Sequence, residues 1–444
     1  MQKVLIANRG EIARRIIRTC KAMGMATVAV YSEADKQMPY VREADEAVWI
    51  GPPPVPQSYL NVEAILEAAR SVRADAVHPG YGLLSENASF AQRCQEAGLV
   101  FIGPAPDVIA KMGDKLTARE IMRQAGVPVV PGSGGMLVDA DEAVDRARQI
   151  GYPVMLKATA GGGGIGMQVV HSDEELRQAY QSAKGRAKAY FGNDAMFLEK
   201  YVQNPHHIEV QIAADQHGQI LHVLERECSI QRRHQKVLEE SPSPFLDEET
   251  RQKICQSAVD AARAVGYTGV GTVEFIMDER KDFYFLEMNT RLQVEHPVTE
   301  EMTGLDLVAL QFDIACNRPL SVRQEEIKAH RHAIEVRVYA EDPETFLPCP
   351  GKIEEYRVPE IEHVRIDDGV EAGTQVTPFY DPMIAKVIAS GVTREEAIQR
   401  LSEALKAFYI GGIKTNLPFL REILDDDSFR AGMYTTHFVQ NRKK

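Results

Sequence analysis

Two short segments of the sequence carry carboxylates that a pair of facing strands would bring together. Glu274 lies in the apolar run GTVEFIM, and Glu287 lies in YFLEMN, whose alternation of apolar and polar residues is typical of a strand. The polar residues Asp278 to Asp282 between the two runs predict a hairpin turn. In a symmetric hairpin the numbers of facing residues have a constant sum, so Glu274 is expected opposite Glu287. Facing carboxylates repel each other unless a positive charge lies between them.

A divalent cation is the positive charge that these residues suit. Asn289 adds an amide oxygen two residues after Glu287, and an all-oxygen ligand set favours Mg²⁺ or Mn²⁺. Mg²⁺ in particular is usually held by one or two carboxylates together with the phosphates of a substrate. The hairpin therefore predicts a site for a metal–nucleotide complex.

A run of four glycines, Gly161 to Gly164, follows Lys157 between two predicted strands. Glycines let backbone amides approach phosphate oxygens closely, and a nearby lysine adds a positive charge. No GK[ST] follows the run, so it is not a Walker P-loop. Because the run joins two strands, a mobile lid over phosphates is favoured over a cradle at a helix terminus. An ordinary flexible hairpin loop is the alternative.

Basic residues gather in two further segments. Lys115 lies in MGDK, and RECSIQRRHQKVLEE contains Arg232, Arg233, His234 and Lys236. A basic cluster alone is usually a solvated face. Here the cluster lies between acidic segments of an acidic protein, which favours an anion-binding pocket.

The composition excludes several classes of protein. With 51 Lys and Arg against 64 Asp and Glu the net charge is −13, whereas a general nucleic-acid-binding surface is basic. The six cysteines are scattered without a CxxC pair, so neither a zinc site nor a disulfide framework is expected. The first residues lack the apolar core of a signal peptide, and no run of about 18 apolar residues could span a bilayer. We therefore expect a cytoplasmic protein with no nucleic-acid or membrane partner.

The order of the predicted elements indicates two or three domains in the 444 residues. Up to about residue 110, short apolar strands alternate with amphipathic helices, which predicts a doubly wound parallel sheet. A helical stretch follows from Asp107 to about Gly126, and the segments around the glycine run predict a small α+β unit. Strands return from Ile208 and lead into the carboxylate hairpin, and a mostly β section begins near Ala333. The fold class is α/β and α+β.

Runs of sequence spread over almost the whole chain resemble biotin carboxylase, the ATP-grasp component of biotin-dependent carboxylases. They include HPGYGLLSEN, KATAGGGGIGM, NPHHIEVQI, ECSIQRRHQKVLEE, EMNTRLQVEHPVTE, HAIEVRVYAED and FYDPMIAK, in family order between residues 4 and 416. EMNTRLQVEHPVTE and QRRHQKV are highly specific, whereas the glycine run alone is not. The resemblance implies an ATP-grasp fold with an N-terminal Rossmann-like domain (residues 1–112), an ATP-grasp domain (113–318, with a glycine-loop lid over about 130–203) and a C-terminal domain (332–440).

The resemblance also implies the residues of an active site. The ATP contacts would be Lys115, Lys157, Gly163, Gly164, Glu199, Lys200, Tyr201, Val202, His207, Gln231, His234, Glu274 and Glu287. The metal ligands would be Glu274, Glu287 and Asn289, in agreement with the hairpin argument. Bicarbonate would be bound by Lys236, Arg291, Gln293 and the backbone of Val294, with Glu295 as the base, and Arg337 would face the ureido oxygen of biotin. Ile165 stands after the glycines where the family usually has a basic residue, which removes one possible phosphate contact.

The implied reaction is the carboxylation of carrier-bound biotin by bicarbonate and ATP through carboxyphosphate. A planar guanidinium suits a planar carbonate, and Arg291 and Lys236 would lower the pKa of Glu295 so that it can accept the bicarbonate proton. The implied cofactors are ATP and two Mg²⁺ or Mn²⁺ ions, with biotin as the carrier-bound substrate. The implied partners are a biotin carboxyl carrier protein, carboxyltransferase subunits and a second copy of the chain. Acetyl-CoA carboxylase, which supplies fatty acid synthesis, is the expected complex, with pyruvate, propionyl-CoA and urea carboxylases as alternatives.

Three other interpretations compete with this one. Another ATP-grasp ligase would share the metal site and the lid, but it would give RLQVEHP and Arg337 no obvious role. A non-catalytic nucleotide-sensing subunit would not need the base and the bicarbonate arginine. A plain α/β protein with a solvated acidic hairpin would require many independent segments to coincide by chance.

Overall fold

The computed structural model describes residues 1–159 and 167–442. The chain begins with a five-stranded parallel sheet in the order β3-β2-β1-β4-β5. Its elements are β1 (Lys3–Ile6), α1 (Gly10–Ala22), β2 (Ala26–Ser32), α2 (Pro39–Glu43), β3 (Glu46–Gly51), α3 (Val62–Ser71), β4 (Ala76–His78), α4 (Ala88–Glu96) and β5 (Val100–Phe101). The predicted parallel sheet is confirmed. Strand β3 was not predicted, because it is an edge strand with exposed residues in its first half.

Two helices lead out of this domain where one helical stretch was predicted. They are α5 (Pro106–Gly113) and α6 (Lys115–Gln124). The break lies at Asp114, whose backbone is extended and whose side chain accepts a hydrogen bond of 2.7 Å from the N–H of Thr117. The extended backbone of Asp114 ends α5, and its side chain caps the N-terminus of α6. Lys115 is therefore fixed at the first turn of α6.

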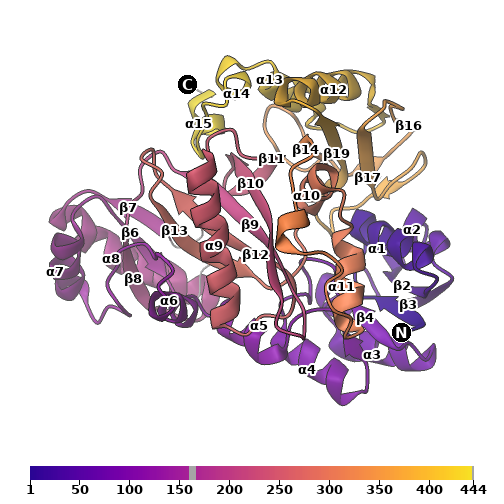
Figure 1. Cartoon of the computed structure of the whole chain (residues 1–444), viewed down its shortest axis with the longest axis horizontal. Helices are drawn as coiled ribbons and strands as arrows, with labels where there is room; N and C mark the ends of the chain where they lie inside the picture. Colours follow the sequence, from indigo (N-terminus) through magenta and orange to yellow (C-terminus); the bar gives the residue numbers. More distant parts are fainter. Residues whose placement is uncertain (160–166, 443–444) are drawn as a thin grey trace.

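A small unit, to the left in Figure 1, is formed by segments that precede and follow the glycine run in the sequence. It contains α7 (Ala140–Ile150), β6 (Val154–Ala158), β7 (Met167–Val170), α8 (Asp173–Phe191) and β8 (Met196–Lys200), with an antiparallel sheet in the order β7-β6-β8. Buried side chains such as Leu156, Leu176 and Leu198 give it a core of its own. The α+β unit is confirmed, and the glycine run connects β6 to β7 through residues outside the described part.

An eight-stranded sheet forms the centre of the molecule. Its order is β13-β12-β9-β10-β11-β14-β19-β17, and every pair is antiparallel. The strands are β9 (His206–Ala214), β10 (Ile220–Arg232), β11 (Gln235–Ser241), β12 (Gly269–Met277), β13 (Phe283–Asn289), β14 (His332–Tyr339), β17 (Val364–Asp368) and β19 (Met383–Gly391). The regions predicted as the ATP-grasp domain (113–318) and the C-terminal domain (332–440) therefore contribute strands to one hydrogen-bonded sheet.

The hairpin β12–β13 has the predicted register. Thr272 pairs with Asn289 and Glu274 with Glu287, and the register shifts by one residue only beyond Glu274. The constant-sum argument is therefore confirmed at the residues that matter. Facing residues of such a ladder present their side chains on the same face of the sheet.

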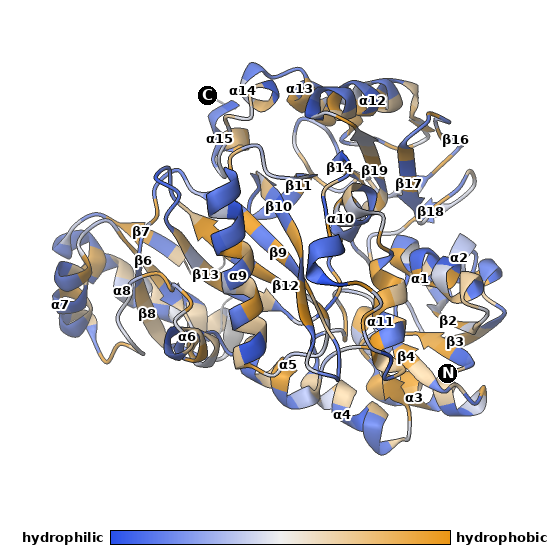
Figure 2. Ribbon diagram, viewed as in Figure 1, coloured by the Kyte–Doolittle hydropathy of each residue, from blue (hydrophilic) through white to orange (hydrophobic). Residues whose placement is uncertain are grey.

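Helices cover the central sheet and complete the fold. They are α9 (Glu248–Ala264), α10 (His296–Thr303), α11 (Leu307–Ala315), α12 (Arg394–Ala407), α13 (Leu417–Leu424), α14 (Asp427–Arg430) and α15 (Phe438–Arg442), with short strands β15 (Gly351–Lys352), β16 (Glu355–Arg357), β18 (Gln375–Val376) and β20 (Tyr409–Gly411). Figure 2 shows hydrophobic residues along the central strands and hydrophilic outer turns on α7 and α9. All six cysteines lie in the described part and are unpaired. No helix among the described residues is long and apolar enough to cross a membrane.

Candidate active site

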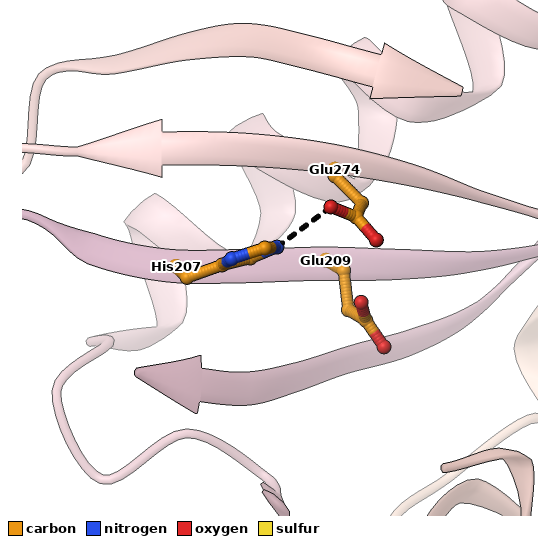
Figure 3. Close-up of side chains that lie close together, drawn as sticks. All are labelled: His207, Glu209 and Glu274. Carbon is orange, nitrogen blue, oxygen red and sulfur yellow. Dashed lines mark ion pairs between the residues drawn. The ribbon is translucent and has the colours of Figure 1, made fainter. Parts of the chain in front are cut away.

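Glu274, on β12, lies at the centre of a dense polar cluster. Its Oε1 accepts hydrogen bonds from Lys236 Nζ (3.0 Å), Asn289 Nδ2 (2.8 Å) and Gln293 Nε2 (2.7 Å). Its Oε2 lies 2.9 Å from Nε2 of His207, on the adjacent strand β9 (Figure 3). Burial would raise the pKa of Glu274, but Lys236 and His207 hold it well below its usual value. Five predicted residues therefore meet at one point.

Lys236 connects this carboxylate to two others. Its Nζ contacts Glu209, lies 3.0 Å from Glu274 and donates a hydrogen bond of 2.6 Å to Glu295. Glu209 is fully buried on β9, two residues from His207, and sequence reasoning missed it. The alternating pattern of β9 could have shown it, because a buried charged residue in a central strand needs a partner.

Arg226 supplies a second buried cation, which was also not predicted. It is fully buried on β10 and contacts Glu209, and its guanidinium donates to Gln293 Oε1 (2.9 Å). It donates further hydrogen bonds to Gln211, Thr272 and Thr299. The expected bicarbonate contact Gln293 is thus fixed between Arg226 and Glu274, with both ends of its amide engaged.

Glu295, the predicted base, lies at the start of α10 between two cations. Its Oε1 accepts from Lys236, and its Oε2 accepts a hydrogen bond of 2.9 Å from Arg337 Nη2. Burial would raise its pKa, but Lys236, then Arg337 and Arg226, hold the pKa well below the usual value. Glu295 is therefore ionised and can accept a proton. The sequence argument named Arg291 with Lys236 as the cause. Lys236 is confirmed as the first cation, and Arg337 and Arg226 add to it; Arg291 also interacts with Glu295, whose charge raises the pKa of the arginine.

Arg291 lies two residues after the end of β13. Its Nε donates to Glu86 Oε2 (2.8 Å) and its Nη2 to Asn289 Oδ1 (2.9 Å). Glu86, from the N-terminal domain, was not predicted to belong to the site. The guanidinium is therefore held by groups from two parts of the chain, with Asn289 linking it to Glu274.

The hairpin residues suit a divalent cation in most respects. Glu274 faces Glu287 across the ladder, and burial together with the charge of Glu274 raises the pKa of Glu287. A cation between the two would relieve that repulsion. The Asn289 amide nitrogen, however, points at Glu274, so its oxygen would have to turn from Arg291 to become a ligand. The ligand atoms of His207, Glu209 and Glu274 also lie within 4.8 Å of one another. Glu274 can therefore bind a cation either together with Glu287 or together with His207 and Glu209. The ligand set Glu274, Glu287 and Asn289 stays a prediction.

A cavity of about 410 Å³ opens between the small lid unit and the hairpin. Eight of the predicted ATP contacts line it: Lys157, Glu199, Lys200, Tyr201, Val202, His207, Gln231 and His234. Thr436, His437 and Gln440, near the end of the chain, close the cavity from a third side, and Tyr201 Oη lies 3.4 Å from His437 Nε2. Sequence reasoning missed these three residues because no motif marks them.

Charged residues extend from this cavity toward the hairpin. Lys157 Nζ contacts the Glu199 carboxylate, and Gln231 Nε2 lies 2.7 Å from His207 Nδ1. Lys115 lies close enough to Glu287 to oppose the rise in its pKa. Among the predicted ATP contacts, Gly163 and Gly164 lie outside the described residues, as does Ile165.

A second cavity, of about 450 Å³, is lined in part by Arg337, a hydrogen-bond partner of Glu295. Its lining includes the predicted residues Arg291, Val294 and Arg337, together with Tyr81 and Phe379. Val294 O accepts a hydrogen bond of 2.8 Å from the buried Lys386. Glu295 is linked to this second cavity through Arg337. It is linked to the first cavity through Lys236, Glu274 and His207. The arrangement can bring two substrates to one base.

Comparison with known proteins agrees with this geometry. Three family models match in succession: biotin carboxylase, N-terminal domain, over residues 1–109; carbamoyl-phosphate synthase L chain, ATP binding domain, over residues 114–323; and biotin carboxylase C-terminal domain over residues 335–441. The chain is 60% identical to a biotin carboxylase of Halalkalibacterium halodurans over 443 residues, which cover 100% of this chain and 98% of that protein. Biotin carboxylase 2 of Bacillus subtilis is 58% identical over 438 residues, with 99% of each chain covered.

Solved structures of the same kind have the same fold. A biotin carboxylase–ATP complex from Campylobacter jejuni aligns with a TM-score of 0.96 at 46% identity, covering 99% of this chain and 98% of that one. The biotin carboxylase domain of the Hydrogenobacter thermophilus 2-oxoglutarate carboxylase, a dimer with MgADP and bicarbonate, aligns with a TM-score of 0.95 at 47% identity, covering 100% and 98%. With these matches over its full length, the chain belongs to the biotin carboxylase family, the ATP-grasp enzymes that carboxylate biotin at the expense of ATP.

Proposed function

We propose that Glu295 is the base that activates bicarbonate and that Lys236, Arg291 and Arg337 bind the reacting anions around it. The observation that carries this proposal is the pair of hydrogen bonds that Glu295 accepts from Lys236 and Arg337. Arg337 lines the second cavity, and Lys236 is linked through Glu274 to His207, which lines the first. The low pKa of Glu295 keeps it ionised at neutral pH, as a general base must be.

The first step joins bicarbonate to the γ-phosphoryl group of ATP. Glu295 accepts the bicarbonate proton, the freed oxygen attacks the γ-phosphorus, and the bond to ADP breaks, which gives carboxyphosphate and ADP. Lys236 and Arg291 offset the charge of the two anions, whose repulsion is the main obstacle to the reaction. A divalent cation held by the hairpin carboxylates would neutralise charge on the phosphate oxygens.

The second step transfers the carboxyl group to biotin. Carboxyphosphate breaks down to CO₂ and phosphate, the phosphate removes the proton from a biotin ureido nitrogen, and that nitrogen attacks CO₂. Arg337 lines the second cavity and would stabilise the negative charge on the ureido oxygen. Biotin is therefore proposed to bind in the second cavity and ATP in the first.

The wider assignments are proposals of the same kind. We infer Mg²⁺ or Mn²⁺ as the metal, a biotinylated carrier protein and carboxyltransferase subunits as partners, a homodimer, and acetyl-CoA carboxylase as the complex. The dimeric Hydrogenobacter thermophilus domain with MgADP and bicarbonate supports the metal, the bicarbonate and the dimer. Relatives named biotin carboxylase match nearly end to end, whereas a propionyl-CoA carboxylase alpha chain is covered over 67% of its length. The cytoplasmic location stays a prediction.

One assay tests the reaction as a whole. We expect the purified chain to hydrolyse ATP when Mg²⁺ and bicarbonate are present, and to do so faster when free biotin is added, with N-carboxybiotin as the product. ATP turnover that depends on an amino acid and ignores bicarbonate would indicate another ATP-grasp ligase. Capture of a biotinylated carrier protein and identification of its transferase would then decide which carboxylase the chain serves.

A further inference from the structure

Behind Arg337 lies a pair of glutamates that lines neither cavity. Glu239 on β11 and Glu335 on β14 are Cα partners in the antiparallel ladder, and both are completely buried. Directly opposed residues of a ladder lie on the same face, with Cβ atoms about 5 Å apart. Two carboxyl groups are thus held side by side in the interior of the sheet, next to the arginine proposed to bind biotin.

Glu239 uses only one of its oxygens. Oε1 accepts a hydrogen bond of 2.7 Å from Arg337 Nε and lies 2.6 Å from Nη2. Among the described residues, Oε2 of Glu239 and both oxygens of Glu335 have no hydrogen-bond partner, although all three are buried. Buried oxygens without partners are costly. A proton on Glu335 lowers this cost, because its O–H can then donate to Glu239 Oε2, which gives two of the three oxygens a partner.

The groups around the pair accommodate one negative charge better than two. The titratable groups around the pair are Lys236 on β11, Cys228 on β10, Arg337 on β14, Lys386 on β19 and Glu295 at the start of α10. Burial raises the pKa of Glu239 to about 7, against the charge of Arg337. Burial raises the pKa of Glu335 well above its usual value, and Glu239 adds to that rise against Lys386. Lys386 is itself engaged by Val294 O and lies 3.3 Å from Glu11.

We propose that Glu239 and Glu335 form a carboxylate–carboxylic acid pair that positions Arg337 for biotin. Glu335 holds the proton and donates it to Glu239 Oε2, and Glu239 stays anionic and holds Arg337 Nε with Oε1. The guanidinium is thereby fixed along its Nε–Nη2 edge, where Nη2 also donates to Glu295, and the arginine lines the second cavity. The pair acts through Arg337 and touches no substrate. The inference rests on the proposed role of Arg337 in binding biotin.

Glu239→Gln tests the anionic member. The amide keeps the size of the side chain but cannot hold a guanidinium as an ion pair, so Arg337 loses its fixed position. We expect the biotin-dependent rate to fall by about 10- to 100-fold, a typical cost of misplacing a substrate-contacting group. ATP hydrolysis with bicarbonate and without biotin should fall far less, so the ratio of the two rates is the readout. An unchanged ratio would overturn the proposal.

Two substitutions test the protonated member. Glu335→Gln replaces the acid O–H with an amide N–H donor, whereas Glu335→Ala leaves Glu239 Oε2 without a donor. We expect Glu335→Ala to lower the biotin-dependent rate much as Glu239→Gln does, and Glu335→Gln to retain most of the rate. Equal losses in both variants would show that Glu335 does not act as a donor.

The pH dependence of stability gives a readout that needs no activity. An acid with a raised pKa in the folded protein stabilises the fold fully at low pH, and this contribution is lost as the pH rises toward that folded pKa. The Tm of the unsubstituted protein should therefore fall, as the pH rises above the usual glutamate pKa of 4.5, more steeply than the Tm of Glu335→Gln, which has no proton to lose. If the Tm values of the two proteins change with pH in parallel, Glu335 does not hold the proposed proton.

Glu240→Gln is the matched control. Glu240 is the buried neighbour of Glu239, but it binds His332 and Arg394. Its substitution should lower Tm and leave the ratio of biotin-dependent to biotin-free rates in place. An unsubstituted protein that does not respond to biotin would refute the proposed function, whereas a responsive protein whose ratio survives Glu239→Gln would refute the pair alone.

Discussion

At the scale of single residues, Lys236 is the cation that three carboxylates share. Glu209, Glu274 and Glu295 all contact its ammonium group, and their charges raise the pKa of Lys236 well above its usual value in spite of burial. One lysine cannot neutralise three carboxylates, so Arg226 and Arg337 complete the balance. The site is therefore prepared for anions only as long as each cation is in place.

The role of Glu295 predicts a selective loss of chemistry. Glu295→Gln keeps the hydrogen bond from one neighbour but removes the proton acceptor, so carboxylation should fall by about 10²- to 10⁴-fold, the usual worth of a general base. Nucleotide affinity should change little, because Glu295 does not line the nucleotide cavity. Steady-state kinetics and ADP titration measure the two effects. Glu362→Gln, at an exposed site, is the control, and near-normal carboxylation in Glu295→Gln would refute the role.

The metal assignment predicts a shift in cation dependence. Glu287→Gln should raise the Mg²⁺ concentration for half-maximal rate by about tenfold or more, since one charged ligand is replaced by a neutral one. Asp282→Asn, at the exposed turn of the same hairpin, should leave that concentration unchanged. If both variants show the same cation dependence, the ion binds elsewhere, and the group of His207, Glu209 and Glu274 becomes the alternative.

At the scale of elements, Arg226 ties four of them together. From β10 its guanidinium reaches β9 through Glu209, β12 through Thr272 and α10 through Thr299. None of these contacts involves solvent-exposed side chains. The arginine therefore fixes the helix that begins with Glu295 against the strands that carry Lys236 and Glu274.

Removing Arg226 should destabilise the fold and the site together. Arg226→Met leaves Glu209 as a buried charge with one cation fewer, and breaking a buried ion pair in this way costs about 3–5 kcal/mol. Thermal and urea unfolding measure the loss. Arg93→Met breaks the exposed ion pair with Glu63 and should produce a much smaller shift in Tm, as surface pairs do. Equal shifts would show that the Arg226 network adds no stability.

The two strands of the hairpin could be predicted from sequence because the residues that specify them are neighbours in the chain. Alternation and a polar turn fixed both strands, and the register of Glu274 and Glu287 followed from symmetry. Lys115, Lys157, His207 and Lys236 belong to short runs that carry the family resemblance. His437 could not be found in this way, because none of these runs covers it. Glu86 lies in HPGYGLLSEN and Arg226 begins RECSIQRRHQKVLEE, but only tertiary packing shows that their side chains reach the site.

At the scale of the whole molecule, three distant segments enclose the proposed nucleotide cavity. The small unit contributes Lys157 and Tyr201, the hairpin β12–β13 contributes Ile276 and Leu286, and residues 436–440 close the third side. A ligand in this cavity contacts all three segments at once. Binding should therefore reduce local opening in the lid and near the end of the chain together.

Hydrogen exchange with and without MgADP tests this coupling. We expect slower exchange of backbone amides in β6, β8 and α15 when MgADP is bound. Strand β3, at the far edge of the N-terminal sheet, serves as the internal control and should not change. Protection confined to the lid would show that residues 436–440 do not take part in binding.

The continuous ladder from β13 to β17 has a consequence for any attempt to divide the protein. Strand β11 is bonded to β10 on one side and to β14 on the other, so a fragment lacking β14 would bare a row of unsatisfied amides and carbonyls. Exposed edges of this kind recruit other chains and lead to aggregation. Exchange of the last hundred or so residues between homologues would thus succeed only when the incoming piece supplies a strand that docks in register on β11.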